Sequence, residues 1–246
     1  MKKINLILAC IFAVLFLSTK VIAQEKKVAL VTFYCDKKIG GTGMGPAGES
    51  LMKDPNFNLQ PILNKAYTRF TTEFAKDFPF KLVDQKIVSE NPQYKSYQSR
   101  FLVDTSKGIN KAMGIQYAVV DGFIWAYSGG PLVKVENRDE VNLYQILKDN
   151  CDGVMLVYID YEITPGMGGF SANITAYFNM TLWDKNGKKV FTIRESGASK
   201  KKVAAVGGIP VMSVEKIQPL CEDATDVLFA ELQGKINKIV KKSANF

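Results

Sequence analysis

Carboxylate side chains are the groups in this sequence that are best suited to proton chemistry. Asp160 and Glu162 stand two residues apart in an apolar stretch, so a strand through them would point both carboxylates to one face. Asp121 and Asp36 are the other acids that can come near this pair. Two carboxylates with different pKa values can act as acid and base in glycan hydrolysis. The competing interpretation, which we favour, is the wet face of an antiparallel strand.

Other catalytic chemistry is restricted because none of the 246 residues is a histidine. This absence excludes Ser-His-Asp triads, Cys-His pairs and histidine-ligated zinc sites. Residues 43–48 spell G-x-G-x-x-G, but nine residues separate them from the preceding apolar run and Pro46 lies inside the motif. A dinucleotide-binding turn needs a tight strand-to-helix connection, so no such site is predicted. We expect no catalytic residue, no metal and no cofactor.

The first 23 residues are typical of a secretory signal peptide. A basic start at Lys2 and Lys3 precedes a short apolar stretch, and small or branched residues end at Ala23. Residues 7–10 resemble a lipobox around Cys10, but the stretch after Cys10 stays apolar. Without this leader the formal net charge falls by three from +8. We therefore expect a periplasmic or secreted protein that does not bind nucleic acid.

Three cysteines would remain after removal of the leader. An oxidising compartment permits a disulfide, and an odd count leaves one thiol over. Cys35 follows the first apolar run, and Cys151 precedes the run that starts at Gly153. If these two runs pair antiparallel, the two cysteines lie at one end of the sheet and can form a disulfide. Cys221 is then the free thiol, while the competing interpretation is three buried, unpaired cysteines.

The apolar segment 112–127 is expected to organise the fold. Residues 117–124 are rich in strand-forming types, and a run apolar on both faces is typical of a covered central strand. Residues 28–33 form a similar run, and we expect the two to be parallel neighbours. Hydrophobic periodicity predicts further helices and strands at 61–78, 80–83, 105–113, 139–150, 153–163, 173–183, 190–193 and 215–241.

This order predicts a single α/β (α+β) domain over residues 24–246, with a mixed sheet and helices packed on it. Parallel first strands should be followed by an antiparallel hairpin that turns at Asn186-Gly187. Pro219 is expected at the start of the regular part of the last helix. Loop insertions are predicted at 36–60 and 127–150, and residues 89–100 are expected to be partly ordered.

Five segments of the chain, taken in order, match a known arrangement of elements: VALVTF at 28–33, FKLVD at 80–84, MGIQYAVVDGFI at 113–124, LWDKNGKKVFTIRES at 182–196 and ATDVLFAELQGKI at 224–236. In these segments and their order the chain resembles the amino-terminal domain of TolB and the curli-secretion-channel family, together with related periplasmic lipoproteins. The resemblance covers most of the chain after the leader. It implies a non-catalytic interaction module of the cell envelope.

The leading hypothesis is therefore an exported assembly module whose partner is another envelope protein. Exposed loops on a rigid scaffold commonly carry recognition, and the candidate contact loops are 36–58, 127–137 and 199–213. A carboxylate-dependent glycan hydrolase is one alternative. A component of an outer-membrane secretion assembly is another, with 165–170 and 203–214 as segments for peripheral membrane contact or insertion.

Overall fold

The computed structural model describes residues 25–40, 50–102, 117–128, 132–206, 209–244 and 246. The predicted leader, the glycine motif at 43–48 and the predicted helix at 105–113 lie outside the described residues.

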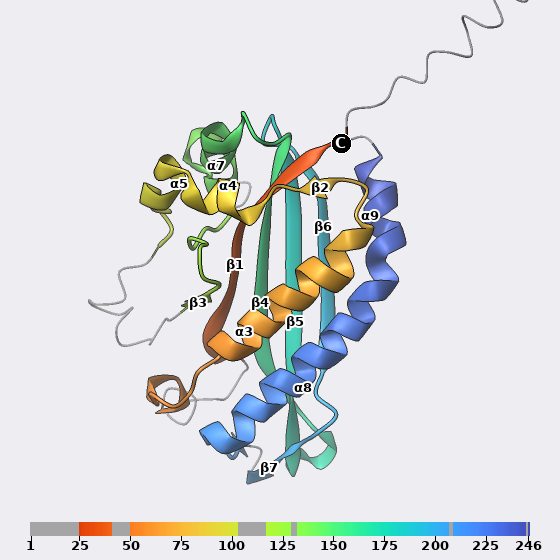
Figure 1. Ribbon diagram of the computed structural model, residues 1–246. Coiled ribbons are helices and arrows are strands. Elements are labelled where there is room, and N and C mark those ends of the chain that lie inside the picture. The colour runs from red at the N-terminus through yellow and green to blue at the C-terminus, as the bar shows by residue number, and fades with distance from the viewer. Residues whose placement is uncertain (1–24, 41–49, 103–116, 129–131, 207–208, 245) are drawn as a thin grey trace, which may run out of the picture.

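A mixed β-sheet forms the centre of the described molecule (Figure 1). Its strands are β1 (Lys27–Gly40), β2 (Lys81–Leu82), β3 (Tyr117–Val119), β4 (Gly153–Pro165), β5 (Ser171–Asp184), β6 (Lys189–Ala198), β7 (Val203–Val206) and β8 (Ile209–Pro210). β1 is parallel to β2 and β4, whereas β4, β5 and β6 form an antiparallel series. The predicted α/β class, with parallel first strands followed by an antiparallel hairpin, is confirmed.

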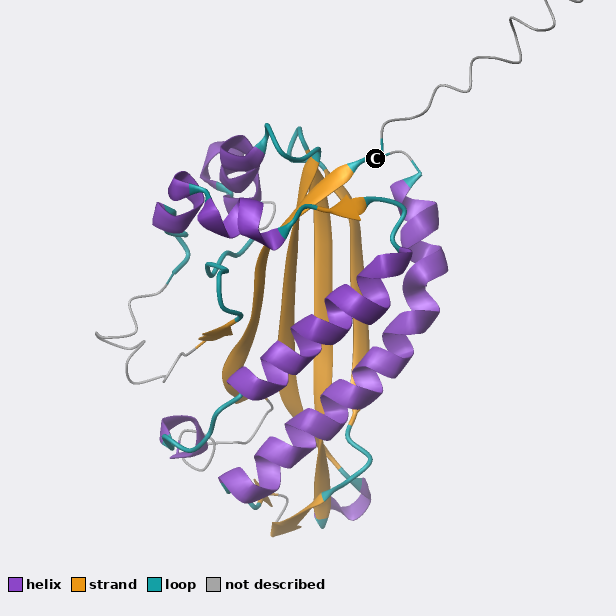
Figure 2. Cartoon of the chain, in the orientation of Figure 1, coloured by secondary structure: helices purple, strands orange, loops and turns teal. Residues whose placement is uncertain are grey.

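The helices cover the two faces of this sheet unequally (Figure 2). They are α3 (Gln60–Arg69), α4 (Gln85–Glu90), α5 (Pro92–Ser96), α7 (Asp139–Leu147), α8 (Val214–Leu232) and α9 (Ile236–Ser243). α3, α8 and α9 cover one face along its length, and the main hydrophobic core lies beneath them. α4, α5 and α7 cover only one end of the opposite face, over a smaller cluster that includes Val31, Val154 and Leu156.

The hairpin of β5 and β6 shows how local sequence produces this architecture. The even-numbered residues of β5, from 172 to 182, are all buried against the helices, as the period-two pattern predicts. The strands turn where Asp184 Oδ1 accepts hydrogen bonds from the backbone N–H groups of Asn186 and Lys188. Gly187 has a φ of 69°, a conformation that glycine adopts without the cost that a Cβ imposes.

The helix predicted at 61–78 is present, with one change of geometry. Regular α-helix ends at Arg69 and continues as a π-turn, Phe70–Phe74, and a 3₁₀ turn, Ala75–Asp77. Phe70 and Phe74 are fully buried, and the ring of Phe70 also contacts that of Phe33 on β1, 5.5 Å away. The aromatic stripe is therefore core, and burying each such ring stabilises the fold by about 2–3 kcal/mol.

The regular part of α8 begins earlier than the position of Pro219 led us to predict. The helix begins at Val214, after Ser213, and Pro219 lies inside it. Because proline has no backbone N–H group, α8 lacks one backbone hydrogen bond at Pro219. The φ angle to which the proline ring is restricted is close to that of an α-helix. Further along, the hydroxyl groups of Tyr161 on β4 and Thr225 on α8 share a buried hydrogen bond of 2.8 Å, which ties the helix to the sheet.

The prediction that 117–124 is a central strand parallel to 28–33 is wrong. β3 has three residues and pairs antiparallel with the far end of β1, where Tyr117 lies opposite Asp36. Asp121 and Gly122 then turn the chain, with Gly122 at a φ of 84°. The apolar side chains of this segment are buried by packing against neighbouring side chains and not by their position in a central strand. β1 itself is an inner strand, as expected.

Residues 89–100 are also more ordered than predicted, because they include α5. Asn91 caps this helix by accepting hydrogen bonds from the N–H groups of Gln93 and Tyr94. The Tyr94 hydroxyl donates to the Val31 carbonyl at 2.9 Å, and Tyr94 is 1% exposed. The loop predicted at 36–60 is likewise shorter, since β1 extends to Gly40 and residues 50–53 are helical.

The predicted Cys35–Cys151 disulfide is wrong, because β1 and β4 are parallel. Cys35 lies opposite Ile159, whereas Cys151 precedes the start of β4, so about 25 Å of strand separates them. Cys35, Cys151 and Cys221 are all buried free thiols, as the competing interpretation expected. The Cys151 thiol donates to the Leu147 carbonyl at 3.4 Å, and burial raises its pKa to about 11.

The close contact of β6 with α8 yields a first prediction. A Cβ on Gly197 would lie 2.2 Å from the Leu228 backbone nitrogen, so Gly197→Ala must push the helix away from the sheet. We expect the free energy of unfolding in urea to fall by about 3 kcal/mol. Gly234→Ala is the matched control, because nothing lies within 4 Å of its added Cβ. A loss for Gly197→Ala no larger than the control would contradict this packing.

Candidate functional site

The sheet face opposite α3 and α8 is the part of the structure that carries a candidate site. Along β4, Val157, Ile159 and Tyr161 point to the helices, so the residues between them point the other way. On that other side, α4, α5 and α7 cover only Val154 and Leu156, near the start of β4. Beyond that cover, the rings of Tyr117 and Trp125 pack against Tyr34 on β1, which is 4% exposed, and the part of the face on β4, β5 and β6 stays open.

A row of four side chains crosses the open face at right angles to the strands. Tyr34 on β1 lies opposite Tyr158 on β4, Tyr158 opposite Asn179 on β5, and Asn179 opposite Arg194 on β6. Side chains directly opposite each other in neighbouring strands are close enough to interact. The rings of Tyr34 and Tyr158 stack with centroids 5.4 Å apart and an angle of 18°. We call these four residues the cross-strand row.

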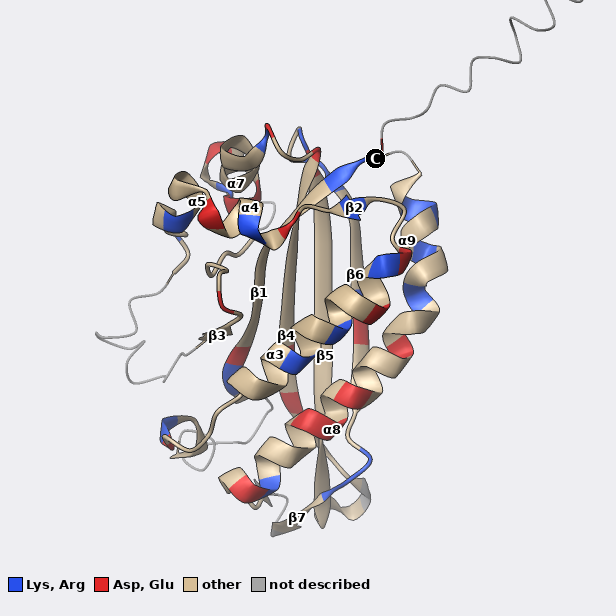
Figure 3. Cartoon of the chain, in the orientation of Figure 1, with Lys and Arg blue, Asp and Glu red and all other residues tan. Residues whose placement is uncertain are grey.

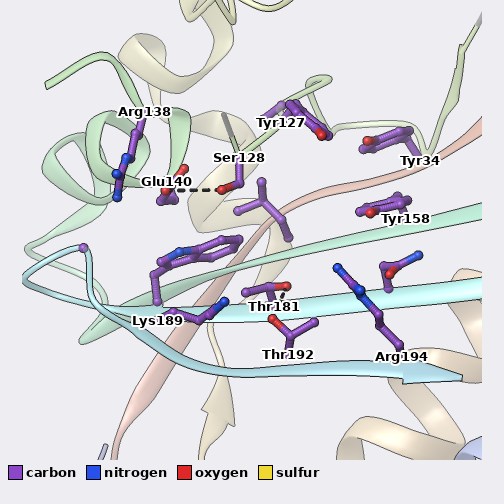
Figure 4. A pocket seen from close by; sticks show the side chains of 15 residues that line it. Tyr34, Tyr127, Ser128, Arg138, Glu140, Tyr158, Thr181, Lys189, Thr192 and Arg194 are labelled. Carbon is purple, nitrogen blue, oxygen red and sulfur yellow. Dashed lines mark hydrogen bonds between the residues drawn. The ribbon is translucent and has the colours of Figure 1, made fainter. Parts of the chain in front are cut away.

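The cross-strand row borders a groove of about 440 Å³ (Figure 4). Thr181 and Thr192 lie on its floor, and their hydroxyls share a hydrogen bond of 3.0 Å. This volume is within the range of small-molecule sites, which is about 300–1,000 Å³. Figure 4 shows the labelled side chains around it: Arg138 and Glu140 at one end, Tyr34 and Tyr158 at the other, and Lys189 and Arg194 beside the strands.

Asp139, at the first turn of α7, positions the wall of the groove. Its carboxylate is fully buried and accepts hydrogen bonds of 2.8 Å from the Tyr97 hydroxyl and from the Tyr127 backbone N–H. A buried carboxylate is costly unless it is hydrogen-bonded, so these donors hold α5 and residues 125–128 against α7. The predicted helix at 139–150 thus serves to fix a wall of the site.

Glu140 is a buried acid of the groove whose hydrogen bonding is incomplete. It is 1% exposed, and its Oε1 accepts a long hydrogen bond of 3.4 Å from the Ser128 hydroxyl. Its Oε2 has no hydrogen-bond partner among the described residues. Burial raises the pKa of Glu140, and the nearby positive charge of Arg138 opposes this shift only in part. This end of the groove therefore has an unused polar atom.

Aromatic side chains continue from the cross-strand row onto the segment after β3. Trp125 lies 4.8 Å from Tyr117, 5.8 Å from Tyr34 and 6.2 Å from Tyr127, measured between ring centroids. The planes of Trp125 and Tyr127 are inclined by only 8°. Tyr127 is 43% exposed, so this aromatic group reaches the solvent at the rim of the groove.

Three cations line the groove without an acidic partner. Within the described part of the chain, Arg138, Lys189 and Arg194 form no ion pair, although Arg138 donates to the Val133 carbonyl at 2.9 Å. On the helix side, acids and cations lie close together where α3 meets α8 (Figure 3). There Lys65 bonds to Glu222 and Asp226 at 3.0 and 3.1 Å. The two faces of the molecule thus differ in electrostatics as well as in cover.

The structure brings together three of the four carboxylates that the sequence singled out. Asp160 and Glu162 project from the open face of β4, next to Asp36 on β1. Burial raises the pKa of Asp160 from 3.8 to about 6, and the negative charges of Asp36 and Glu162 add to this shift. Asp121 lies apart from them, exposed in the turn after β3.

The structure describes only part of the three predicted contact loops. Residues 41–49 of the first loop and 129–131 of the second lie outside the described residues. In the third, β7 pairs with β5, and the Ala205 N–H donates to the Phe170 carbonyl at 2.9 Å. This pairing joins the two segments considered for membrane contact, and the side chain of Phe170, the last residue of segment 165–170, is 80% exposed. Among the described residues, no helix has the length and apolar character to cross a membrane.

Sequence reasoning missed the cross-strand row. The polar positions of 173–183 identified the face of β5 that the helices leave open, but nothing in them indicated which residues of β1, β4 and β6 lie beside Asn179. No family model matches this chain, and no curated protein matches its sequence. No group of acids and cysteines that could hold a metal ion occurs in the described part of the chain.

The shifted pKa of Asp160 yields a second prediction. Because the folded state holds this proton up to about pH 6 and the unfolded state only to about 3.8, the carboxylate destabilises the fold as pH rises through that window. We expect Asp160→Asn to raise the free energy of unfolding at pH 7.5 by about 1 kcal/mol, because solvent screens part of the shift. At pH 3.5 the gain should vanish.

Urea denaturation at both pH values measures this difference. Asp121→Asn is the control, because Asp121 is exposed and makes no hydrogen bond or ion pair within the described residues. Equal stability of Asp160→Asn and the parent protein at pH 7.5 would show that the Asp160 carboxylate is solvated like an ordinary surface acid.

Proposed function

We propose that this chain is an exported binding module of the cell envelope, which recognises another envelope component through the groove without catalysing a reaction. The observation that carries this proposal is the contrast between the two sheet faces. The helix face is covered and the cations of α3 pair with acids of α8, whereas the open face carries aromatic rings and cations that form no ion pair with the described residues. Aromatic and arginine side chains are the types that dominate recognition surfaces.

The rigidity of the groove supports a recognition role. Its floor lies on β4, β5 and β6, whose pairing is continuous beneath the cross-strand row. Its wall is held by the buried bonds of Asp139. Side chains fixed before binding lose little conformational entropy when a partner arrives, which favours affinity.

Export and the identity of the partner stay predictions. Residues 1–23 have the pattern of a signal peptide, and the resemblance to the TolB amino-terminal and curli-secretion-channel domains implies an envelope protein as the partner. The absence of histidine from the whole sequence favours binding over most hydrolytic mechanisms.

Capture from envelope extract of the source organism tests this proposal. The protein without its leader should retain a reproducible component, and Arg194→Glu should reduce the retained amount at least tenfold, because it reverses a charge beside the groove. Lys241→Glu is the matched control, since Lys241 is exposed on α9, away from the groove. Equal capture by both variants, or no reproducible capture by the parent protein, would overturn the proposal.

Glycan hydrolysis is a second candidate function, and the Asp160 carboxyl is the observation that favours it. A carboxylic acid with a pKa of about 6 keeps its proton in mildly acidic solution, as a general acid requires. If this function holds, the protein releases reducing sugar from cell-wall or capsular glycans near pH 5–6. Asp160→Asn should then abolish the release while Asp121→Asn retains it. No release by the parent protein would dismiss this candidate.

A further inference from the structure

We propose that the ligand of the groove is an acidic saccharide, a sugar ring that carries a carboxylate. This inference rests on the proposed function, because it takes the groove as the recognition site and adds the chemical class of its ligand. Four features of the lining carry it: cations without an ion pair among the described residues, an amide without a hydrogen bond there, hydroxyl and carboxyl oxygens with unused bonding capacity, and exposed aromatic surface.

The cations call for a negative charge on the ligand. Arg138, Lys189 and Arg194 contribute three positive charges to the lining, and Glu140 is its one acid. None of the three cations forms an ion pair within the described part of the chain, whereas Lys65, Arg69 and Lys235 on the helix side all do. Arginine binds carboxylates through two parallel hydrogen bonds, so a ligand carboxylate is the natural partner of this group.

The uncharged polar groups of the lining favour ligand hydroxyls rather than a second charge on the ligand. The Asn179 amide, between Tyr158 and Arg194 in the cross-strand row, makes no hydrogen bond with the described residues. An amide offers both donors and an acceptor, and a hydroxyl group satisfies either. Thr181 and Thr192 bond to each other, which leaves each hydroxyl oxygen with a further lone pair for a ligand.

Glu140 strengthens the case for a hydroxyl at the inner end of the groove. Its unpartnered Oε2 accepts a hydrogen bond when the carboxyl is ionised, and a protonated carboxyl donates one instead. A hydroxyl serves both states, because it is donor and acceptor at once. Because Oε2 has almost no accessible surface in this structure, the Glu140 carboxyl must rotate toward the groove before a ligand hydroxyl bonds to it.

The aromatic side chains complete the match. Tyr158 and Tyr127 line the groove, and an aromatic face buries the apolar C–H face of a sugar ring while the hydroxyls remain at its edge. A volume of about 440 Å³ accommodates one or two sugar rings. An acidic peptide would also supply a carboxylate, but its backbone N–H and C=O groups point in fixed, alternating directions and suit a sheet edge better than a sheet face.

Titration of the protein without its leader with four probes tests the inference, with Trp and Tyr fluorescence and NMR line shifts as readouts. The probes are D-glucuronate, D-glucose, the peptide Glu-Ser-Glu and acetate. We expect glucuronate to bind at least tenfold more tightly than glucose or acetate, because only it engages both the cations and the hydroxyl-binding groups. Its affinity should fall as salt concentration rises.

Two variants locate the binding. Arg194→Gln should weaken glucuronate about tenfold and leave the weak binding of glucose unchanged, whereas Asn179→Ala should weaken both sugars. Lys241→Gln on α9 is the control and should change neither. Circular dichroism and urea unfolding of each variant confirm that the fold is retained, which we expect because Arg194 is exposed and Asn179 is only partly buried.

The outcomes separate this inference from the proposed function. Equal binding of glucuronate and glucose would overturn the role of the cations, and tighter binding of Glu-Ser-Glu would assign the groove to an acidic peptide. If none of the probes binds while Arg194→Glu still abolishes capture of an envelope component, the saccharide inference fails and the proposed function stands. If capture also fails, both fall.

Discussion

The parallel pairing of β1 with β4 is the constraint on which the rest of the structure depends. It requires a long crossover between the two strands, and the chain uses that crossover to place α3 on one face and α4, α5 and α7 on the other. It also places Cys35 opposite Ile159, in the middle of β4, while Cys151 precedes the start of that strand, so that the two thiols stay apart and free. Because every later strand pairs outward from β4, this one choice of direction orders the whole sheet.

Unequal cover of the two faces then separates stability from recognition. The face beneath α3 and α8 buries most of the large apolar side chains, and its hydrophobic burial is the main driving force for folding. The helices on the opposite face are short and stop before the cross-strand row. The side chains of Tyr158, Asn179 and Arg194 are therefore held by a stable sheet but contribute little to its core, which leaves them available for binding.

Electrostatics follow the same division. On the helix side, Lys65 and Arg69 of α3 bridge to Asp226 of α8 at 3.1 Å, which neutralises charges where two helices meet. On the open side, like charges gather: cations at the groove and the Asp36, Asp160 and Glu162 carboxylates further along the strands. Burial is the main cause of the raised pKa of Asp160, and the nearby negative charges of Asp36 and Glu162 add to it.

Local patterns in the sequence were enough to determine the α/β class, the hairpin at Gly187, the aromatic stripe that contains Phe70 and the proximity of Asp160 to Glu162. These follow from side-chain periodicity and turn chemistry, which act over a few residues. Only the tertiary structure decided that 117–124 is peripheral, that β4 runs parallel to β1 and that Tyr34, Tyr158, Asn179 and Arg194 form one row. Strand order and helix cover arise from long-range packing, in which an apolar run is equally stable beneath a helix, a loop or another strand.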